Sequence, residues 1–246
     1  MAAATTSRVE AHAAWQARGM PQEPVVVPAH DARADVLRAE GWVVTARSFG
    51  AVLHGDDADP VRLRSAVERV AGIVSVRELG PDDQAAMLAL DAATLDDYPG
   101  GPATQHVPLT AGTARVPSAA RRAFGAVDAD GSLVALTVVD LDADGRRAEV
   151  DFTVVHPAHR SRGLATAVKA ASVRALLGDG VATIRTGGSS GNAGILAASA
   201  AIGFRVDEEW LTLDAPEPRD QGSRGSGRSG GEADPADQAD RALREG

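Results

Sequence analysis

A strand, a short turn and a helix follow one another between residues 149 and 177, and this succession constrains the fold more than any other stretch. Residues 149–155, Glu-Val-Asp-Phe-Thr-Val-Val, are largely apolar and β-branched, which predicts a strand. Residues 164–177 have the composition and apolar spacing of a helix. The turn between them leads to backbone N–H groups that have no intrahelical partner, and the helix dipole favours negative charge there. Residues 160–163 therefore predict an anion site, with Arg160 and Arg162 adding positive charge.

The spacing within this turn is that of neither a GxxxxGK[ST] loop nor a GxGxxG loop. Instead, Arg160-x-x-Gly163-x-Ala165 resembles the coenzyme A signature of the GCN5-related N-acetyltransferase (GNAT) family, R/Q-x-x-G-x-G/A. Val155-His156-Pro157 precedes it at the family's spacing, and Gly203-Phe204 resembles the Leu-Gly-Phe that closes a later helix in the family. The resemblance covers roughly residues 73–214.

The resemblance implies an α/β (α+β) GNAT fold, in which a mixed, mostly antiparallel sheet is flanked by helices on both faces. It also implies acetyl-CoA as the co-substrate. Backbone N–H groups of the turn would hold the pyrophosphate, and main-chain groups of the preceding strand would pair with the pantetheine arm. The expected coenzyme-binding residues are Thr153, Val154, Val155, Arg160, Ser161, Arg162, Gly163, Leu164, Ala165, Thr166 and Asn192. The alternative is an ordinary strand–turn–helix with exposed arginines.

For the catalytic base, the sequence favours Glu149, because Ala148-Glu149-Val150 resembles the Ala-Glu-Ile that carries the base in the histone acetyltransferase branch. A partly desolvated carboxylate there would have its pKa raised toward the working pH. Asp151 shares its strand face by alternation and is the second candidate, as a base or as a group that binds the acceptor. The alternative is that both carboxylates are solvated on an exposed strand.

Two departures from the family pattern leave the activity open. Gly187 stands where many members have a carboxylate, and Ser199 stands where many have a tyrosine acid. The expected reaction is direct acetyl transfer from acetyl-CoA to a primary amine of a small molecule or peptide. The alternative is a non-catalytic acyl-CoA-binding or regulatory module. The acidic pair Asp96-Asp97 suggests a cationic acceptor, and Tyr98 beside it either lines the acceptor pocket or is an exposed loop residue.

Composition excludes several other classes of function. The chain has no cysteine, so a disulfide, a thiolate metal site and a cysteine nucleophile are excluded. Its net charge of −9 argues against binding to nucleic acid, and no apolar run is long enough to span a membrane. His156 and His159 form an i,i+3 pair without a further nearby ligand, so no metal is expected. We expect a cytoplasmic monomer or homodimer without a signal peptide.

Three segments are expected along the chain. Residues 1–72 form an N-terminal αβ segment, residues 73–214 the GNAT acetyltransferase domain, and residues 215–246 a disordered tail that contains almost no large apolar residue. In the second segment a helix is predicted over residues 84–94, and Asp-Gly turns at residues 128–131 and 142–145 predict two hairpins.

The first segment resembles the back half of the second. In both, the predicted order is a helix, a strand, a helix, a Gly-aromatic pair and two strand-like runs. The N-terminal elements are expected at residues 8–18, 23–27, 32–40, 43–48 and 50–54, with Gly41-Trp42 as the pair, and a further helix follows over 61–70. One hypothesis is a truncated, degenerate repeat whose sheet is completed by packing on the second unit, and the other is an unrelated αβ cap.

Overall fold

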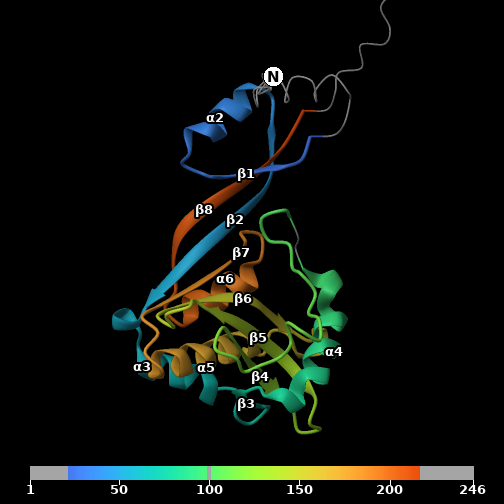
Figure 1. Ribbon diagram of the computed structural model, residues 1–246, viewed down its shortest axis with the longest axis vertical. Coiled ribbons are helices and arrows are strands. Elements are labelled where there is room, and N and C mark those ends of the chain that lie inside the picture. Colours follow the sequence, from blue (N-terminus) through green and yellow to red (C-terminus); the bar gives the residue numbers. More distant parts are fainter. Residues whose placement is uncertain (1–21, 99–100, 217–246) are drawn as a thin grey trace, which may run out of the picture. The chain divides into compact units, whose positions relative to one another are not determined.

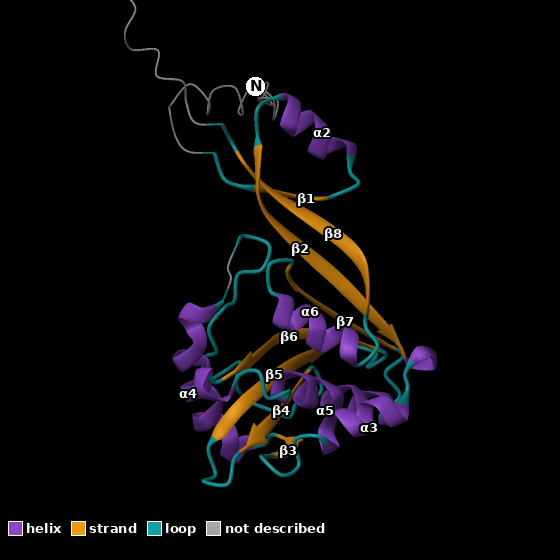
Figure 2. Ribbon diagram, turned by 180° about the vertical axis from the view of Figure 1, so that it is seen from behind, coloured by secondary structure: helices purple, strands orange, loops and turns teal. Residues whose placement is uncertain are grey.

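The computed structural model describes residues 22–98 and 101–216, and within them the strands form one mixed sheet flanked by helices (Figure 1, Figure 2). The strand order is β1-β8-β2-β7-β6-β5-β4-β3, and each neighbouring pair is antiparallel except β6 and β7. The predicted fold class is therefore confirmed. The strands are β1 (Val25–Pro28), β2 (Val43–His54), β3 (Ser75–Glu78), β4 (Arg121–Val127), β5 (Leu133–Leu141), β6 (Arg147–Val155), β7 (Thr183–Ser189) and β8 (Arg205–Asp214).

Helices cover both faces of this sheet. Leu63 of α3 and Val173 of α5 share one apolar cluster with residues of β2, β6 and β7. Met87 and Leu90 of α4 belong to a different cluster, formed with β4, β5 and β6 on the opposite face. The helices are α2 (Ala32–Ala39), α3 (Pro60–Glu68), α4 (Gln84–Thr94), α5 (Leu164–Gly178) and α6 (Ala193–Ala201), with short 3-10 turns η1 (Gly55–Asp57), η2 (Pro81–Asp83), η3 (Leu95–Asp97) and η4 (Pro157–His159).

The two predicted hairpins are confirmed, and they deliver β6 to the turn. Asp128 N donates to Ser132 O between β4 and β5, and Asp142 N donates to Arg147 O between β5 and β6. Strand β5 is buried over its first seven residues, as expected for a strand that has α5 on one face and α4 on the other. The meander therefore ends with β6 at the middle of the sheet, directly before η4 and α5.

The prediction of separate strands at residues 43–48 and 50–54 was wrong, as was that of two strand-like runs after Phe204. The structure has a single long β2 and a single long β8. Strand β2 lies between β7 and β8 and pairs with both. Hydrogen-bond ladders on its two sides therefore keep it a continuous strand through Gly50. In place of the predicted break near residue 49, the structure has a β-bulge in the pairing of β2 with β8, between Gly50 and Ala51.

The segments β1–α2–β2 and β7–α6–β8 are related by an internal two-fold symmetry. Gly41 and Gly203 are equivalent glycines 162 positions apart (203 − 41), and Ser48 pairs with Trp210 at the same separation (210 − 48). Adding 162 to the β2 residue and subtracting 162 from the β8 residue converts the pair Val44–Leu213 into the pair Ala51–Val206. The same operation converts one of the two bulges into the other. Strand β1 pairs with β8 as β7 pairs with β2. The axis therefore passes between Ser48 and Trp210.

The two helices of this symmetric pair also start and end alike. Asp31 caps α2 and Asn192 caps α6, each with a side-chain oxygen that accepts a backbone N–H. At the other end, Trp42 N donates to Leu37 O and Phe204 N donates to Ser199 O. In each helix a backbone hydrogen bond to the residue five positions earlier thus closes the last turn. The strands of the N-terminal segment thus belong to the sheet of the main unit. The helix expected at residues 8–18 and the tail from residue 217 lie outside the described residues.

Candidate coenzyme and acceptor site

Two cavities meet where β6 and β7 diverge. These strands pair in parallel over three residues only, from Arg147–Thr183 to Glu149–Arg185, and within the described residues no further pair joins them. The β6 edge from Val150 to Val155 is therefore open toward β7. A bulge at Asp151 increases the divergence, because Val139 pairs with Val150 while Val138 pairs with Phe152. The open edge of this strand separates a cavity of about 780 Å³ from one of about 580 Å³.

We call the larger one the cradle cavity, and it lies at the start of α5. Gly163 is the N-cap of this helix with a φ of 81°, a conformation that favours glycine, and Ser161 also has a positive φ of 61°. The first intrahelical bond of α5 runs from Ala167 N to Gly163 O. The N–H groups of Leu164, Ala165 and Thr166 come before it and point toward the helix start, which suits a pyrophosphate.

Most of the predicted coenzyme residues line this cavity. They are Thr153, Val154, Val155, Arg160, Ser161, Gly163, Leu164, Ala165, Thr166 and Asn192. Arg162 does not line it, and its side chain is exposed. Asn192 uses Oδ1 to cap α6 by accepting from Ile195 N at 3.1 Å, so its Nδ2 is the atom left for a ligand. His159 also lines the cavity, and its buried Nδ1 has no partner in the described part of the chain.

Arg160 is held by the protein itself. Its guanidinium pairs with Asp97 of η3, and its Nε donates to Val155 O at 3.2 Å. The carboxylate of Asp97 thus offsets much of the positive charge that the sequence predicts for the turn. Asp97, one of the acidic pair that suggested a cationic acceptor, lines the cradle cavity and not the smaller one, so its charge does not bear on the acceptor from there. The backbone N–H groups and the dipole of α5 remain as the anion-binding elements.

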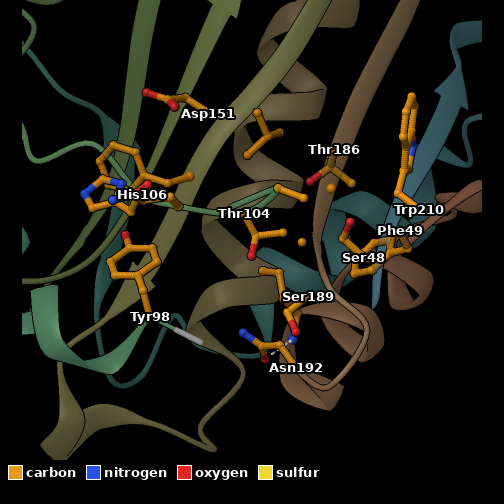
Figure 3. Close-up of a pocket in the computed structure, with 18 of the residues that line it drawn as sticks. Ser48, Phe49, Tyr98, Thr104, His106, Asp151, Thr186, Ser189, Asn192 and Trp210 are labelled. Carbon is orange, nitrogen blue, oxygen red and sulfur yellow. Dashed lines mark hydrogen bonds between the residues drawn. The ribbon is translucent and has the colours of Figure 1, made fainter. Parts of the chain in front are cut away.

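We call the smaller one the carboxylate cavity, because Glu149, Asp151 and Glu208 line it. Figure 3 shows Tyr98 and His106 on one side and Ser48, Phe49 and Trp210 on the other. Tyr98, Thr153, Asn192 and Ile195 line both cavities and mark where they join. The β2 and β8 walls flank the two-fold axis, so the N-terminal segment supplies part of this cavity.

The two predicted catalytic carboxylates differ in their partners. Asp151 forms an ion pair with Arg121, which also binds Asp140 at 2.5 Å. Burial opposes the charge of Arg121, but its hydrogen bonds to Asp151 and Asp140 outweigh this and raise its pKa. Glu149 is exposed and makes no ion pair within the described residues. Of the two, Glu149 is therefore the carboxylate without an ion-pair partner in the described chain, and its exposure does not supply the partial desolvation that the sequence analysis expected.

An aspartate, an imidazole and a phenol form a buried group that the sequence analysis missed. Asp91 of α4 contacts His106 Nε2 at 2.6 Å and accepts Leu109 N at 2.8 Å, so it fixes the loop that follows Tyr98. The rings of Tyr98 and His106 stack at 4.2 Å. Burial raises the pKa of Tyr98, and the charges of Asp91 and Asp151 add to this, so the phenol stays protonated. Of the two alternatives for Tyr98, the structure supports a residue that lines a pocket, because Tyr98 is half-buried and lines both cavities. The one sequence signal for Asp91 was its place on the apolar face of α4.

The remaining chemical groups near the cavities are structural. Ser199 is buried on α6, and its hydroxyl has no partner among the described residues. His156 accepts a hydrogen bond from Ala158 N through Nδ1 and so caps the start of η4. Within the described residues, no three His, Asp or Glu side chains gather as a metal site, and no helix is long and apolar enough to cross a membrane.

Comparison with known proteins identifies this arrangement. Residues 89–204 match the family model described as the acetyltransferase (GNAT) family. A comparison with curated protein sequences gave no match.

Solved structures share the fold at low sequence identity. A tandem GNAT protein from the clavulanic acid biosynthesis pathway is 23% identical with a TM-score of 0.58, over 85% of this chain and 70% of that one. A GCN5-related N-acetyltransferase from Kribbella flavida is 19% identical with a TM-score of 0.57, over 85% of this chain and 73% of that one. One from Sphaerobacter thermophilus is 17% identical with a TM-score of 0.57, over 79% and 60%. At these identities the similarity concerns the fold alone.

Proposed function

Because residues 89–204 carry its domain, this chain belongs to the GNAT acetyltransferase family, and we propose that it moves an acetyl group from acetyl-CoA to a primary amine. The observation that carries the proposal is the junction of the two cavities at the open edge of β6. A thioester held along this edge from the cradle cavity would present its carbonyl to a molecule in the carboxylate cavity. Such positioning converts a bimolecular reaction into one within a single complex.

The residues of the cradle cavity would bind the coenzyme, which supplies the acetyl thioester. Backbone N–H groups from Ser161 to Thr166 would hold the pyrophosphate at the start of α5. Main-chain groups of Thr153, Val154 and Val155 would pair with the pantetheine arm as an added strand does, because this edge of β6 has no β7 partner. Asn192 would contribute Nδ2 from the other side.

Glu149 would act as the general base. An amine that is charged in solution must lose a proton before its nitrogen attacks the thioester carbonyl, and the C–S bond then breaks to give the amide and the thiolate. Glu149 would accept that proton and release it to solvent. The second proton, which the nitrogen loses as the C–S bond breaks, would pass through water to the thiolate, so that the products are the amide, the free thiol and one proton. Its position in the carboxylate cavity, without an ion pair in the described chain, supports this role over Asp151. Asp151, held by Arg121, would instead shape the acceptor side.

The test of activity is release of free thiol from acetyl-CoA against a panel of amines. Glu149→Gln should lower kcat/KM by about 10²- to 10⁴-fold and remove the acidic limb of its pH profile. Glu209→Gln is the matched control, since Glu209 is an exposed β8 residue that does not line the cavity. Asp151→Asn and Asp140→Asn separate a site role from loss of the shared contact with Arg121. Full activity of Glu149→Gln would eliminate it as the base.

The test of the coenzyme site is binding of CoA, measured by calorimetry. Ala165→Asp places a carboxylate in the first turn of α5, where it favours the helix but repels a phosphate. We expect at least a tenfold weaker Kd. Ala85→Asp is the matched control in the first turn of α4, at an exposed position. Unchanged binding by Ala165→Asp would show that the cradle is misplaced, and binding without turnover of any amine would favour a regulatory module.

We also propose that residues 1–72 are a truncated, degenerate GNAT repeat, followed by the main domain over 73–214. The segments β1–α2–β2 and β7–α6–β8 have the same order of elements, and their strands pair symmetrically with one another. This symmetry supports a repeat more than it supports an unrelated cap. A chain that begins at residue 73 would lack β2, and β7 and β8 would lose their common neighbour. We expect it to be insoluble or unfolded by circular dichroism, and a well-folded, active product would refute the proposal.

A further inference from the structure

The carboxylate cavity gathers half of the aromatic residues of a chain that has few. The sequence contains three Trp, one Tyr and four Phe. Of these, Phe49, Tyr98, Phe152 and Trp210 line this cavity. Tyr98 and Trp210 are partly exposed, on the two sides that Figure 3 shows, while Phe49 and Phe152 are buried behind them. The cavity thus offers a flat apolar surface on each side.

The aromatic surfaces are fixed by contacts with neighbouring side chains of the protein. The stack of Tyr98 on His106 is held by the 2.6 Å contact from His106 to Asp91, and the His106 ring meets Phe152 edge-on at 4.5 Å. On the other side, Trp210 Nε1 donates to Glu208 Oε2 at 3.1 Å. Both walls are therefore ordered before a ligand binds, which lowers the entropy lost on binding.

The charges between these walls favour a cation. Arg185 is the single cationic side chain lining the cavity in the described chain, and it is held by Asp207 and Glu208 at 2.6–3.0 Å. Its hydrogen bonds to Asp207, against some desolvation, raise its pKa, so it stays charged and paired. Arg121 likewise neutralises Asp151 from outside the cavity. Glu149 remains as the carboxylate that makes no ion pair in the described chain, and its charge helps to raise the pKa of Arg185.

We propose that the acceptor is a small primary amine that is cationic at neutral pH and carries an aromatic ring. Its ammonium would lie at Glu149, and its ring would pack between Tyr98 and Trp210. A cavity of about 580 Å³ holds one such molecule, within the usual range for small ligands. An anionic acceptor would meet the Glu149 charge without a free cation. The inference rests on the proposed acetyl transfer and names its substrate class.

The test compares amines that differ in one property at a time. 2-Phenylethylamine and 2-cyclohexylethylamine have the same charge and similar size, so their ratio of kcat/KM isolates the aromatic ring. We expect a ratio of about 2 to 12 in favour of the aromatic amine, from ring–ring and cation–ring contacts. Spermidine adds charge without a ring, and 4-aminobenzoate adds a ring without a cation; both should be poorer acceptors.

Substitutions in the walls show whether the preference arises in this cavity. Trp210→Leu and Tyr98→Leu should each reduce the aromatic-to-cyclohexyl ratio toward 1. Trp42→Leu is the matched control, because Trp42 packs in the cluster of β1, α2 and the ends of β2 and β8. Thermal melts identify any variant that fails to fold, and the two wall variants lie on different elements.

Failure of the acceptor class differs from failure of the proposed function. Equal ratios in the wild type, or spermidine as the best acceptor, would overturn the aromatic acceptor while acetyl transfer stands. Turnover of no amine at all would count against the proposed function, and calorimetry with 2-phenylethylamine would then decide the binding claim. Weaker binding to Trp210→Leu than to Trp42→Leu would support it, and no binding to the wild type would refute it.

Discussion

Lys169 is the only lysine of the chain and lies fully buried on α5. Its Nζ donates to Thr186 Oγ1 at 2.8 Å and lies 5.5 Å from the centre of the Phe204 ring. No carboxylate pairs with it in the described chain, and Ser172, its neighbour on α5, bonds to the Lys169 carbonyl. Replacement by methionine keeps the length of the side chain and removes the amine.

The cost of this buried amine follows from its pKa. Burial lowers the pKa of Lys169 from 10.5 to about 7. In the unfolded chain the amine is protonated up to about pH 10, so between pH 7 and 10 the unfolded state binds more protons and stability rises with pH. With about 1.4 kcal/mol per pH unit, the penalty approaches 5 kcal/mol in acid, and about 2 kcal/mol of it is recovered between pH 7 and pH 9.

The assay is urea unfolding of the full chain, followed by circular dichroism at pH 6, 7, 8 and 9. The wild type should gain about 2 kcal/mol from pH 7 to pH 9, whereas Lys169→Met should show little of this slope. At pH 7 the variant should be at least as stable as the wild type, although Thr186 loses a hydrogen bond worth about 1 kcal/mol. Arg174→Met, on the exposed side of the same helix, is the control and should keep the slope.

The pH window is chosen to isolate this one group. The raised pKa of Tyr98 acts only above pH 10, where the unfolded chain loses the phenolic proton, and the lowered pKa of Asp83 acts only in acid. A wild-type stability that is flat from pH 7 to pH 9 would refute the reasoning. So would a Lys169→Met variant that is several kcal/mol less stable at pH 7 but keeps the slope.

Three further changes test the frame around the site. Asp91→Asn should cost about 1–3 kcal/mol in urea unfolding and speed proteolysis of residues 101–110, because two buried hydrogen bonds lose their charged acceptor; an equally resistant loop would contradict this. Gly187→Ala should cost about 1–3 kcal/mol, seen as a lower Tm, because its Cβ would lie 2.9 Å from Phe49 O. Arg77 holds the pKa of Asp83 below its usual value, so Arg77→Gln should move acid unfolding to higher pH, and an unchanged midpoint would count against the pair.

Local patterns were enough to predict most elements of the main unit. The helix at residues 84–94, both Asp-Gly hairpins and the strand–turn–helix at 147–178 are confirmed. In each case the signal lies in a few neighbouring residues, as turn residues or as apolar spacing. Ten of the residues that line the cradle cavity fall within residues 153–166, so a short motif could place this part of it.

Long-range pairing was beyond these patterns. Strand periodicity does not state which strands are neighbours, so the insertion of β2 between β7 and β8 could not be predicted. The same holds for the ion pair of Arg160 with Asp97, which joins residues 63 positions apart. Lys169 lies on a helix whose spacing suggests an ordinary core face, and its lack of an ionic partner became visible only with β7 and Phe204 in place.

This difference explains why the coenzyme is easier to infer than the acceptor. The cradle cavity is lined by β6, the turn after it and the start of α5, together with α6 and residues 94–98, and the helix start among them leaves backbone N–H groups that suit a pyrophosphate. The carboxylate cavity takes its walls from β2, β6, β7, β8 and the loop after Tyr98. Two of these strands pair across the two-fold axis, where Trp210 pairs with its equivalent Ser48, so the two halves of the sheet contribute unlike side chains. If the amine binds in this cavity as proposed, the positions at which the two halves of the sheet differ set the choice of acceptor.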